Sequence, residues 1–422
     1  MPSGTARAGT ARGLQRVPAR NHEEPRSTPP KRRRRRKIKY QLFSLGEGLD
    51  MPLFVFIMVL LAIGLVMLFS ASYADSYYRE NNSYYYIVRQ GGFAIAGVIA
   101  MLLISAFDYH NFHRLTLPIA GVTILMLLAV LLFGRVLHIK EIAPAEGEAV
   151  RWLNIGPVQF QPSEIAKFAI ILMFADMISR WEDRMDQFMF GVLPFGVVLG
   201  VFALLVFLEN HMSGTLIIGM LGAMMMFVGG TKPRWLVLGA LVLGGLLVLY
   251  MTRGGGEDGG PYQMGRIEVW LDPLVENDAT WQTRQSLYAI GSGGLFGVGL
   301  GQSRQKYMYL PAPQNDFIFA VVCEELGLVG ALVIMILFAL LVWRGVHISL
   351  HAKDKFGMML GLGMTLQIGL QAALNICVVT NTVPNTGISL PFFSYGGTSL
   401  LMLLGEMGIL LNISRSANVE KT

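Results

Sequence analysis

The chain has 422 residues, of which 53% are hydrophobic and 15% are charged, and its mean hydropathy is +0.50. A composition this apolar excludes an ordinary soluble domain and predicts a protein that crosses a membrane several times. The net charge of +6 comes from one end of the chain, because residues 1–40 hold 13 of the 34 Lys and Arg but only 2 of the 28 Asp and Glu. The remainder is net acidic, so the charge gives no argument for nucleic-acid binding.

The basic N-terminal tail, residues 1–49, contains five consecutive arginines between Lys31 and Lys37. Such a run is typical of a cytoplasmic orientation signal and of a segment attracted to anionic lipids. A solvated, disordered tail is compatible with both roles. No signal peptide is predicted, because the first apolar run begins only near Met51 and is long enough to span the membrane.

Ten apolar runs follow the tail, each close to the roughly 20 residues that a transmembrane helix needs. The predicted fold class is therefore an all-α integral membrane protein, a polytopic bundle of ten transmembrane helices at residues 50–413, with a short cytoplasmic tail at 414–422. The predicted spans are 51–72, 86–107, 117–133, 164–178, 190–208, 212–228, 236–250, 317–343, 357–379 and 396–413.

The short connections carry Lys and Arg on one side only, as the positive-inside rule requires if the tail is cytoplasmic. The connections at 209–211 and 380–395 contain neither residue type. Ten spans then return the C-terminus to the cytoplasm, and two long loops, 134–163 and 251–315, face outward. The basic residues assigned to the inner side are Arg114, Arg180, Arg184, Lys232, Arg234, Arg344, Lys353 and Lys355.

Two features that often carry chemistry are interpreted here as structural. The only cysteines, Cys323 and Cys377, lie in apolar runs, which predicts free buried thiols and neither a disulfide framework nor a Cys-based metal site. A glycine cluster at 291–301 lacks the spacing of a nucleotide-binding loop, and no strand precedes it. Its glycines are expected to permit tight turns or close backbone approach.

A polar motif joins the first long loop to the fourth predicted helix. Ser163 and Glu164 predict a helix start, and Glu164 and Lys167 have the i, i+3 spacing of an ion pair. The structural interpretation is a helix cap with a lysine that snorkels to the membrane surface. The functional interpretation is that an ionisable residue within a span marks a site by default. The motif comprises Arg151, Trp152, Gln161, Pro162, Ser163, Glu164 and Lys167.

Asp316 follows a Pro-rich approach and immediately precedes a long apolar run, so its carboxylate is expected at the mouth of the eighth membrane helix. One interpretation is a helix N-cap. Within a continuous helix, Asp316, Ala320, Cys323 and Gly327 would share one face as a stripe of small residues below the acid.

Two further acids, Glu324 and Glu325, fall within the same apolar run and must face protein or water. Polar residues of the ninth helix, Gln367 and Gln371, are candidate structural partners for them. The loop at 380–399 is uncharged and rich in hydroxyl groups and glycine. It could direct backbone donors to an anionic head group or form only a re-entrant turn.

Four motifs between the third predicted helix and the chain end form a highly specific combination. They are Arg151-Trp152 with Gln161-Pro162-Ser163-Glu164 and Lys167; Gly299-Leu300-Gly301 with Gln305-Lys306 and Tyr309-Leu310-Pro311; Asn315-Asp316-Phe317-Ile318-Phe319 with Glu324-Glu325-Leu326-Gly327; and Leu390-Pro391 with Ser394-Tyr395-Gly396-Gly397-Thr398-Ser399. The chain thereby resembles the SEDS family (shape, elongation, division and sporulation), in its FtsW and SpoVE branch more than RodA. The basic tail and Asn315, where many relatives have Thr, are departures that do not touch the expected chemistry.

The resemblance implies a peptidoglycan glycosyltransferase that polymerises lipid II outside the cytoplasmic membrane during cell division. The GlcNAc 4-hydroxyl of one lipid II would attack the MurNAc anomeric carbon of another, releasing undecaprenyl diphosphate. Family knowledge makes Asp316 the essential acid, and we expect it to act as general base. Arg151 and Lys167 would hold the diphosphate. The expected substrate-binding residues are Arg151, Trp152, Gln161, Ser163, Glu164, Lys167, Lys306, Ser394, Tyr395, Gly396 and Gly397.

No tightly bound cofactor is expected. A divalent cation, Mg²⁺ or Mn²⁺, is compatible with a diphosphate leaving group, although no ligand set is visible in the sequence. The implied partners are lipid II, a monofunctional (class B) penicillin-binding transpeptidase with a single membrane helix and other division proteins, with anionic lipids at the basic tail and no nucleic acid. The implied location is the bacterial cytoplasmic membrane at the division septum, with both termini in the cytoplasm.

Two other functions fit the same sequence. A lipid II flippase would also use ten spans, intramembrane acids and a lipid-linked substrate. No inverted repeat or matched pair of Gly/Pro-broken helices is evident, which disfavours a transporter. A non-catalytic scaffold for the division machinery is the third hypothesis, and it predicts that variants of Asp316 support division normally.

Overall fold

The computed structural model describes residues 48–139, 141–146, 149–156, 158–253 and 262–417. The chain divides into two units, Met1–Lys39 and Tyr40–Thr422, and only the second contains described residues. The predicted basic tail at 1–49 therefore lies outside the described residues except for its last two positions. The predicted C-terminal tail begins within the last helix, which ends at Ser416, and residues 418–422 lie outside the described part.

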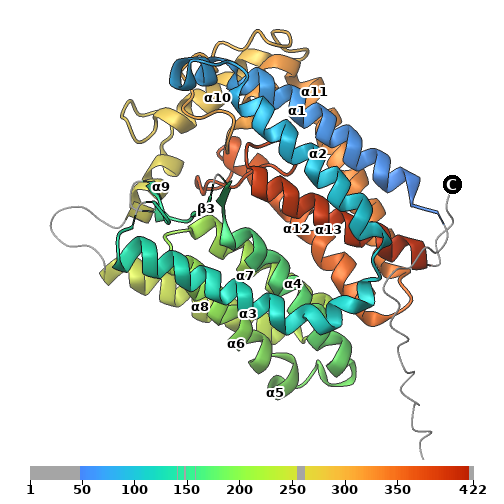
Figure 1. Ribbon diagram of the computed structural model, residues 1–422. Helices are drawn as coiled ribbons and strands as arrows, with labels where there is room; N and C mark the ends of the chain where they lie inside the picture. Colours follow the sequence, from blue (N-terminus) through green and yellow to red (C-terminus); the bar gives the residue numbers. More distant parts are fainter. Residues whose placement is uncertain (1–47, 140, 147–148, 157, 254–261, 418–422) are drawn as a thin grey trace, which may run out of the picture. The chain divides into compact units, whose positions relative to one another are not determined.

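Helices dominate the described chain (Figure 1). They are α1 (Met51–Glu80), α2 (Tyr85–Ala106), α3 (Phe112–Val130), α4 (Pro162–Trp181), α5 (Phe188–Gly191), α6 (Leu193–Leu208), α7 (Met212–Gly229), α8 (Pro233–Arg253), α9 (Tyr262–Leu271), α10 (Trp281–Gly293), α11 (Ile318–Leu350), α12 (Lys355–Val379) and α13 (Gly397–Ser416). Short 3-10 turns lie at Tyr109–Asn111 and Glu182–Arg184, and a π-helical turn lies at Leu131–Val136.

The first long loop contains two small antiparallel hairpins that the sequence did not reveal. Strand β1 (Ala145–Glu146) pairs with β2 (Ala149–Val150), and β3 (Leu153–Ile155) pairs with β4 (Val158–Phe160). Leu153 lies opposite Phe160 in the second hairpin, which leads directly into α4. The hairpin therefore places Arg151 and Trp152 just before β3 and close to the start of a buried helix.

Eight helical segments in the described residues are long and apolar enough to cross a membrane, so the protein is an integral membrane protein. Two of the ten predicted spans fall outside this group. Helix α4 carries charged side chains along its length, beginning with Glu164 and Lys167 and ending with Asp176 and Arg180. In α8 the described apolar run, Pro233–Val242, is short. The polytopic fold is confirmed, while the number ten stays a prediction.

Successive spanning helices run in opposite directions, so the connections after α1, α3, α6, α8 and α12 meet at one end of the bundle. We call this end the loop end; among the described residues it comprises 81–84, 137–139, 141–146, 149–156, 158–161, 209–211, 262–317 and 380–396. Connections with Lys232 and Lys353 lie at the opposite end, as the predicted topology requires. Arg344 was also predicted in one of these connections, but it lies inside α11. There it forms a buried ion pair of 2.7 Å with Asp50, the residue before α1.

Helix α4 forms the centre of the packing. It contacts α3, α7 and α12, and 14 of its 20 residues are buried. Helix α12 also packs on α11, and α13 packs along α2 (Figure 1). Charged α4 is therefore shielded from lipid by its neighbours, which is how a bundle tolerates ionisable residues at membrane depth.

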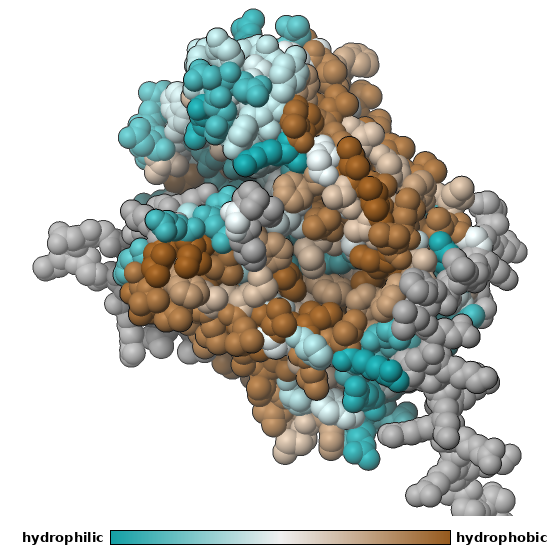
Figure 2. Space-filling model, viewed as in Figure 1, coloured by the Kyte–Doolittle hydropathy of each residue, from teal (hydrophilic) through white to brown (hydrophobic). Residues whose placement is uncertain are grey.

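The helices turn an apolar surface outward. On α2, Val88, Ile95, Ile99 and Leu103 are each more than half exposed, and their spacing places them on one face. Figure 2 shows apolar residues over much of the surface in this view, with hydrophilic residues gathered toward the two ends of the helices. This distribution is expected for a protein whose helix flanks contact hydrocarbon.

Helix α11 is broken at Gly327, about two and a half turns after its start at Ile318. Gly327 has φ 67° and ψ −169°, and a Cβ there would lie 2.3 Å from the Gly297 nitrogen. The loop at 294–299 fills the break: Val298 and Gly299 donate backbone hydrogen bonds to the carbonyls of Glu324 and Glu325 (2.9 and 3.1 Å). The predicted continuous stripe from Asp316 to Gly327 is therefore wrong, since α11 begins at Ile318 and is interrupted at Gly327.

The structural interpretations of the cysteines and of the glycine cluster are also tested by the structure. Cys323 and Cys377 are free thiols; Cys323 is buried as predicted, whereas Cys377 is only partly buried. Within the glycine cluster, Gly294, Gly297, Gly299 and Gly301 all have positive φ, which confirms the predicted tight turns.

Candidate active site

A cavity of about 620 Å³ opens at the loop end, where the first turns of α4, α7 and α13 and the approach to α11 meet. Its volume falls within the range of typical ligand pockets. Eleven of the twelve predicted site residues line it, although they come from segments far apart in the sequence. They are Arg151, Trp152, Gln161, Ser163, Glu164, Lys167, Asp316, Ser394, Tyr395, Gly396 and Gly397.

Asp316 is half-buried at the cavity wall, and its backbone is clamped. The Asn375 side chain on α12 donates from one nitrogen to the carbonyls of Asp316 (2.7 Å) and Ile388 (2.6 Å). A Cβ on Gly387, whose φ is +68°, would lie 3.0 Å from an Asp316 carboxylate oxygen. The N-cap position of α11 is held by Phe317, so the helix-cap interpretation of Asp316 is not supported.

The loop at 384–396 supports the same segment. The Ser394 hydroxyl donates to the carbonyl of Asn315 (2.6 Å) and accepts from the Leu390 nitrogen (2.8 Å), while the Tyr395 nitrogen donates to the Gln314 carbonyl (2.8 Å). Both bonds of the Ser394 hydroxyl go to backbone. This loop therefore positions the residues beside Asp316 in addition to lining the cavity.

Lys167 and Glu164 form the predicted ion pair, with 2.8 Å between the ammonium and the carboxylate. Both side chains are buried, and the Ser399 hydroxyl donates to the other Glu164 oxygen (2.9 Å). The pair thus links α4 to the first turn of α13. Buried opposite charges at this spacing compensate each other, which explains how α4 keeps both charged groups inside the bundle.

Arg151 lines the cavity and contacts the corner between α6 and α7, where its guanidinium donates to the Asn210 carbonyl (2.9 Å). The corner also holds Glu209, whose carboxyl is fully buried, and His211, whose ring lines the cavity. Burial raises the pKa of Glu209 to about 9, although Arg151 opposes the shift. Burial, with Arg151 and Lys167, lowers the pKa of His211 to about 3. Both groups are therefore uncharged at neutral pH.

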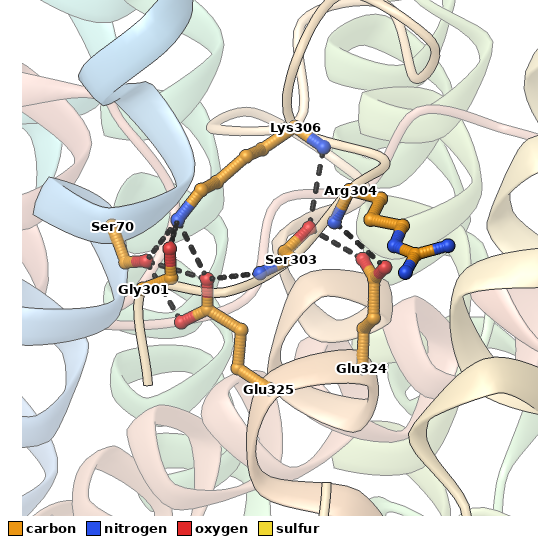
Figure 3. A network of polar contacts seen from close by, with 7 residues as sticks. All are labelled: Ser70, Gly301, Ser303, Arg304, Lys306, Glu324 and Glu325. Atoms are coloured by element: carbon orange, nitrogen blue, oxygen red, sulfur yellow. Dashed lines mark hydrogen bonds and ion pairs between the residues drawn. The ribbon is translucent and has the colours of Figure 1, made fainter. Parts of the chain in front are cut away.

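Lys306 is the predicted site residue that lies outside the cavity. Its ammonium is 2.9 Å from Glu325, 3.1 Å from the Ser70 hydroxyl and 2.6 Å from the Gly301 carbonyl (Figure 3). The lysine side chain is 3% exposed. The Lys306 ammonium makes these contacts within the protein. The geometry therefore indicates a structural role for Lys306 rather than contact with substrate.

The two acids of α11 belong to this same network. Glu324 accepts hydrogen bonds from the Ser303 hydroxyl and the Arg304 nitrogen (2.9 Å), as Figure 3 shows. The predicted partners were different: Gln367 instead donates to Glu406 on α13 (3.1 Å), and Gln371 lines the cavity. Sequence pattern located these acids correctly inside the protein but did not identify the loop that satisfies them.

Several cavity residues were missed by the sequence argument, among them Arg89, His211 and Gln371, as was the clamping residue Asn375. The signal that marks them is a polar side chain inside or beside an apolar run, which is costly unless it faces a cavity or a partner. The described residues contain no group of three His, Cys, Asp or Glu placed to hold a metal ion. The described residues therefore do not supply a complete set of protein ligands for a metal ion in this cavity.

The fold and the cavity define a class: an integral membrane protein of many helices, with an acid and several basic groups in one cavity at the loop end. The family model described as "Cell cycle protein", covering FtsW, RodA and SpoVE, matches residues 51–419. The chain therefore belongs to the FtsW/RodA/SpoVE family.

Curated relatives match over most of their length. "Stage V sporulation protein E" of Bacillus subtilis (strain 168) is 37% identical, with 87% of this chain and 97% of that protein covered. "Probable peptidoglycan glycosyltransferase FtsW" of Geobacter sp. (strain M18) is 36% identical, with the same coverage. A solved structure described as "Structural coordination of polymerization and crosslinking by a peptidoglycan synthase complex" matches with a TM-score of 0.73 and 25% identity, over 88% of this chain and 99% of that one.

Proposed function

We propose that this chain is a peptidoglycan glycosyltransferase that polymerises lipid II, with Asp316 as the general base. Its family and the names of its relatives supply the reaction class. The observation that carries the proposal is that one cavity is lined by Asp316 together with Arg151 and Lys167.

In the proposed reaction, the 4-hydroxyl oxygen of the acceptor sugar forms a bond to the anomeric carbon of the donor, and the bond from that carbon to the diphosphate oxygen breaks. A sugar hydroxyl is a weak nucleophile until it loses its proton. The Asp316 carboxylate accepts that proton as attack proceeds, which typically contributes about 10²- to 10⁴-fold to the rate. The clamp by Asn375 and Ser394 supports this role, because a general base must be held at hydrogen-bond reach.

The leaving diphosphate takes the electron pair and needs positive charge nearby. Arg151 offers a planar guanidinium that can contact two phosphate oxygens, whereas Lys167 acts as a point charge already shared with Glu164. A divalent cation bound to the diphosphate of the substrate is part of the proposal. The roles of Arg151 and Lys167 do not depend on that cation.

The membrane setting follows from the same proposal. The loop end would face outward and both termini would lie in the cytoplasm, at the division septum. The partner would be a class B penicillin-binding transpeptidase; the solved structure cited above is described as a complex for polymerization and crosslinking.

The test is Asp316→Asn in the full-length protein with purified lipid II in detergent, where there is no bilayer to cross. Polymerisation is expected to fall at least about 100-fold because the amide cannot accept the proton. Asp278→Asn makes the same chemical change at an exposed loop residue and is expected to keep full activity. Full activity of Asp316→Asn would remove this residue from the chemistry, and transport of labelled lipid II without glycan synthesis by the unmodified protein would favour a flippase.

A further inference from the structure

The helices of the second long loop contact both segments that meet at Asp316. The first segment, 309–316, carries the acid into α11, and the second, 380–388, follows α12; we call the second segment the 380–388 turn. At the start of α10 the Trp281 indole donates to the Tyr309 carbonyl of the first segment (2.7 Å). Helix α9 also lies at the loop end (Figure 1), and it contacts the 380–388 turn.

Helix α9 holds this turn at two points. The Trp270 indole donates to the Asn381 carbonyl (3.1 Å), and the Asn381 side chain donates back to the Trp270 carbonyl (3.1 Å). One helical turn earlier, the Arg266 guanidinium donates to the Asn385 carbonyl (2.9 Å). Residues four apart share one face of a helix, so a single face of α9 spans the turn from Asn381 to Asn385.

Asn385 connects α9 to the acid. Its side-chain oxygen accepts from the Gly387 nitrogen (3.2 Å), which is an Asx turn, and its side-chain nitrogen donates to Gln282 on α10 (3.4 Å). Gly387 lies against the acid, because a Cβ there would be 3.0 Å from an Asp316 carboxylate oxygen. Three successive contacts therefore join Arg266 to the Asp316 carboxylate.

The 380–388 turn depends on its neighbours for its position. Its backbone is irregular, with positive φ at Asn381 and Gly387, and it contains no charged side chain. Hydrogen bonds from a cationic donor are stronger than those between neutral groups, so the Arg266 contact is a strong fastening point. A displacement of about 1 Å at a reacting group can cost about 100-fold in rate, so the position of this turn matters to a base that lies against it.

Arg266 and Trp270 are not among the residues that line the cavity, whereas Gly387 and Asp316 are. An effect of α9 on the reaction therefore has to pass through the 380–388 turn. Substrate binding by Arg151 and Lys167 does not involve these contacts, because those two side chains lie on other segments.

We propose that Arg266 is a positioning residue for Asp316, which acts through Asn385 and Gly387 without touching the substrate. Trp270 supports the same face of α9. This inference rests on the proposed function for the role of Asp316 as general base. It gives the second long loop a part in the reaction besides carrying the acid, because α9 fixes the backbone against which the carboxylate lies.

The first test is Arg266→Met in the full-length protein with purified lipid II in detergent. Methionine keeps much of the side-chain length but has no donor. The kcat for polymerisation is expected to fall about tenfold because the carboxylate loses its fixed neighbour, while KM changes less than about twofold. Arg266→Lys keeps a cationic donor and should retain more than about a third of kcat. A raised KM with unchanged kcat in Arg266→Met would overturn the proposal.

The matched control is Arg304→Met, which makes the same chemical change at an exposed loop-end residue outside the cavity. The backbone nitrogen of Arg304 joins the network of Figure 3, and that contact survives the substitution. Both kcat and KM should therefore stay unchanged. An unchanged kcat in Arg266→Met together with a lowered thermal midpoint would show that Arg266 only stabilises the loop, and it would refute the positioning role.

A second measurement does not depend on activity. In a background with Cys323→Ala and Cys377→Ala, the thiol introduced by Asp316→Cys is labelled with a maleimide, with and without Arg266→Met. Labelling should be at least about threefold faster with Arg266→Met, because the 380–388 turn no longer stays packed against position 316. An unchanged labelling rate would overturn the proposal.

The two measurements separate this inference from the proposed function. If the unmodified protein makes no glycan but Arg266→Met accelerates labelling, the glycosyltransferase is refuted and the positioning contact is supported. If the unmodified protein polymerises lipid II while Arg266→Met changes neither kcat nor the labelling rate, the positioning role alone is refuted.

Discussion

At the corner between α6 and α7, Glu209 combines complete burial with a carboxyl group that has no hydrogen-bond partner among the described residues. Its pKa of about 9 lies well above the ordinary value of 4.5. The folded protein therefore holds a proton that the unfolded chain releases. The stability contributed by this group is complete below about pH 4.5 and is lost as the pH rises through 9.

We expect the free energy of unfolding to fall by about 1.4 kcal/mol per pH unit between pH 6.5 and 8.5, relative to Glu209→Gln. Glutamine mimics the neutral carboxyl and does not titrate. His211 does not interfere, because its lowered pKa makes its contribution complete above about pH 6.5 and lost only as the pH falls through 3. Thermal unfolding in detergent across this window checks the result, and parallel curves for the two proteins would contradict it.

At the scale of elements, the loop from 294 to 317 carries Asp316, and the buried network of Figure 3 fastens this loop to α1 and α11. Lys306 and Glu325 are 3% and 0% exposed, and their charges are 2.9 Å apart. Removing one member of such a pair leaves an uncompensated buried charge, whereas removing both relieves it.

Lys306→Met is therefore expected to destabilise the protein by about 3–5 kcal/mol, and the double variant Lys306→Met/Glu325→Gln is expected to recover most of that loss. Thermal unfolding of both single variants and the double variant gives the coupling energy. A raised KM for lipid II in Lys306→Met with an unchanged thermal midpoint would instead restore the substrate-binding role predicted from sequence.

At the scale of the whole molecule, the helix directions place the basic connections at one end and the cavity at the other. The positive-inside rule then predicts that the loop end faces outward. In a background with Cys323→Ala and Cys377→Ala, Asn82→Cys at the loop end should react with an impermeant maleimide on intact cells. Lys353→Cys, at the opposite end, should react only after lysis. The reverse pattern would show that the cavity faces the cytoplasm.

The sequence by itself determined the membrane class, most of the spans, the Glu164–Lys167 pair and eleven of the residues that line the cavity. Hydropathy and i, i+3 spacing are local properties of the sequence, so they are visible without the tertiary structure. The motifs shared with the SEDS family identify site residues even when their neighbours in space are not known. A carboxylate at the mouth of an apolar run is costly and therefore made Asp316 conspicuous, but its position alone also fitted a helix cap. The resemblance to the SEDS family is what implied that Asp316 is the essential acid.

Only the tertiary structure decided which polar groups satisfy one another. Lys306 pairs with Glu325 and Ser70, Asn375 clamps Asp316, and α11 breaks at Gly327 because the glycine-rich loop at 294–299 enters it. These contacts join helices that are distant along the chain. A buried polar group must find a partner, but its sequence position does not specify which one.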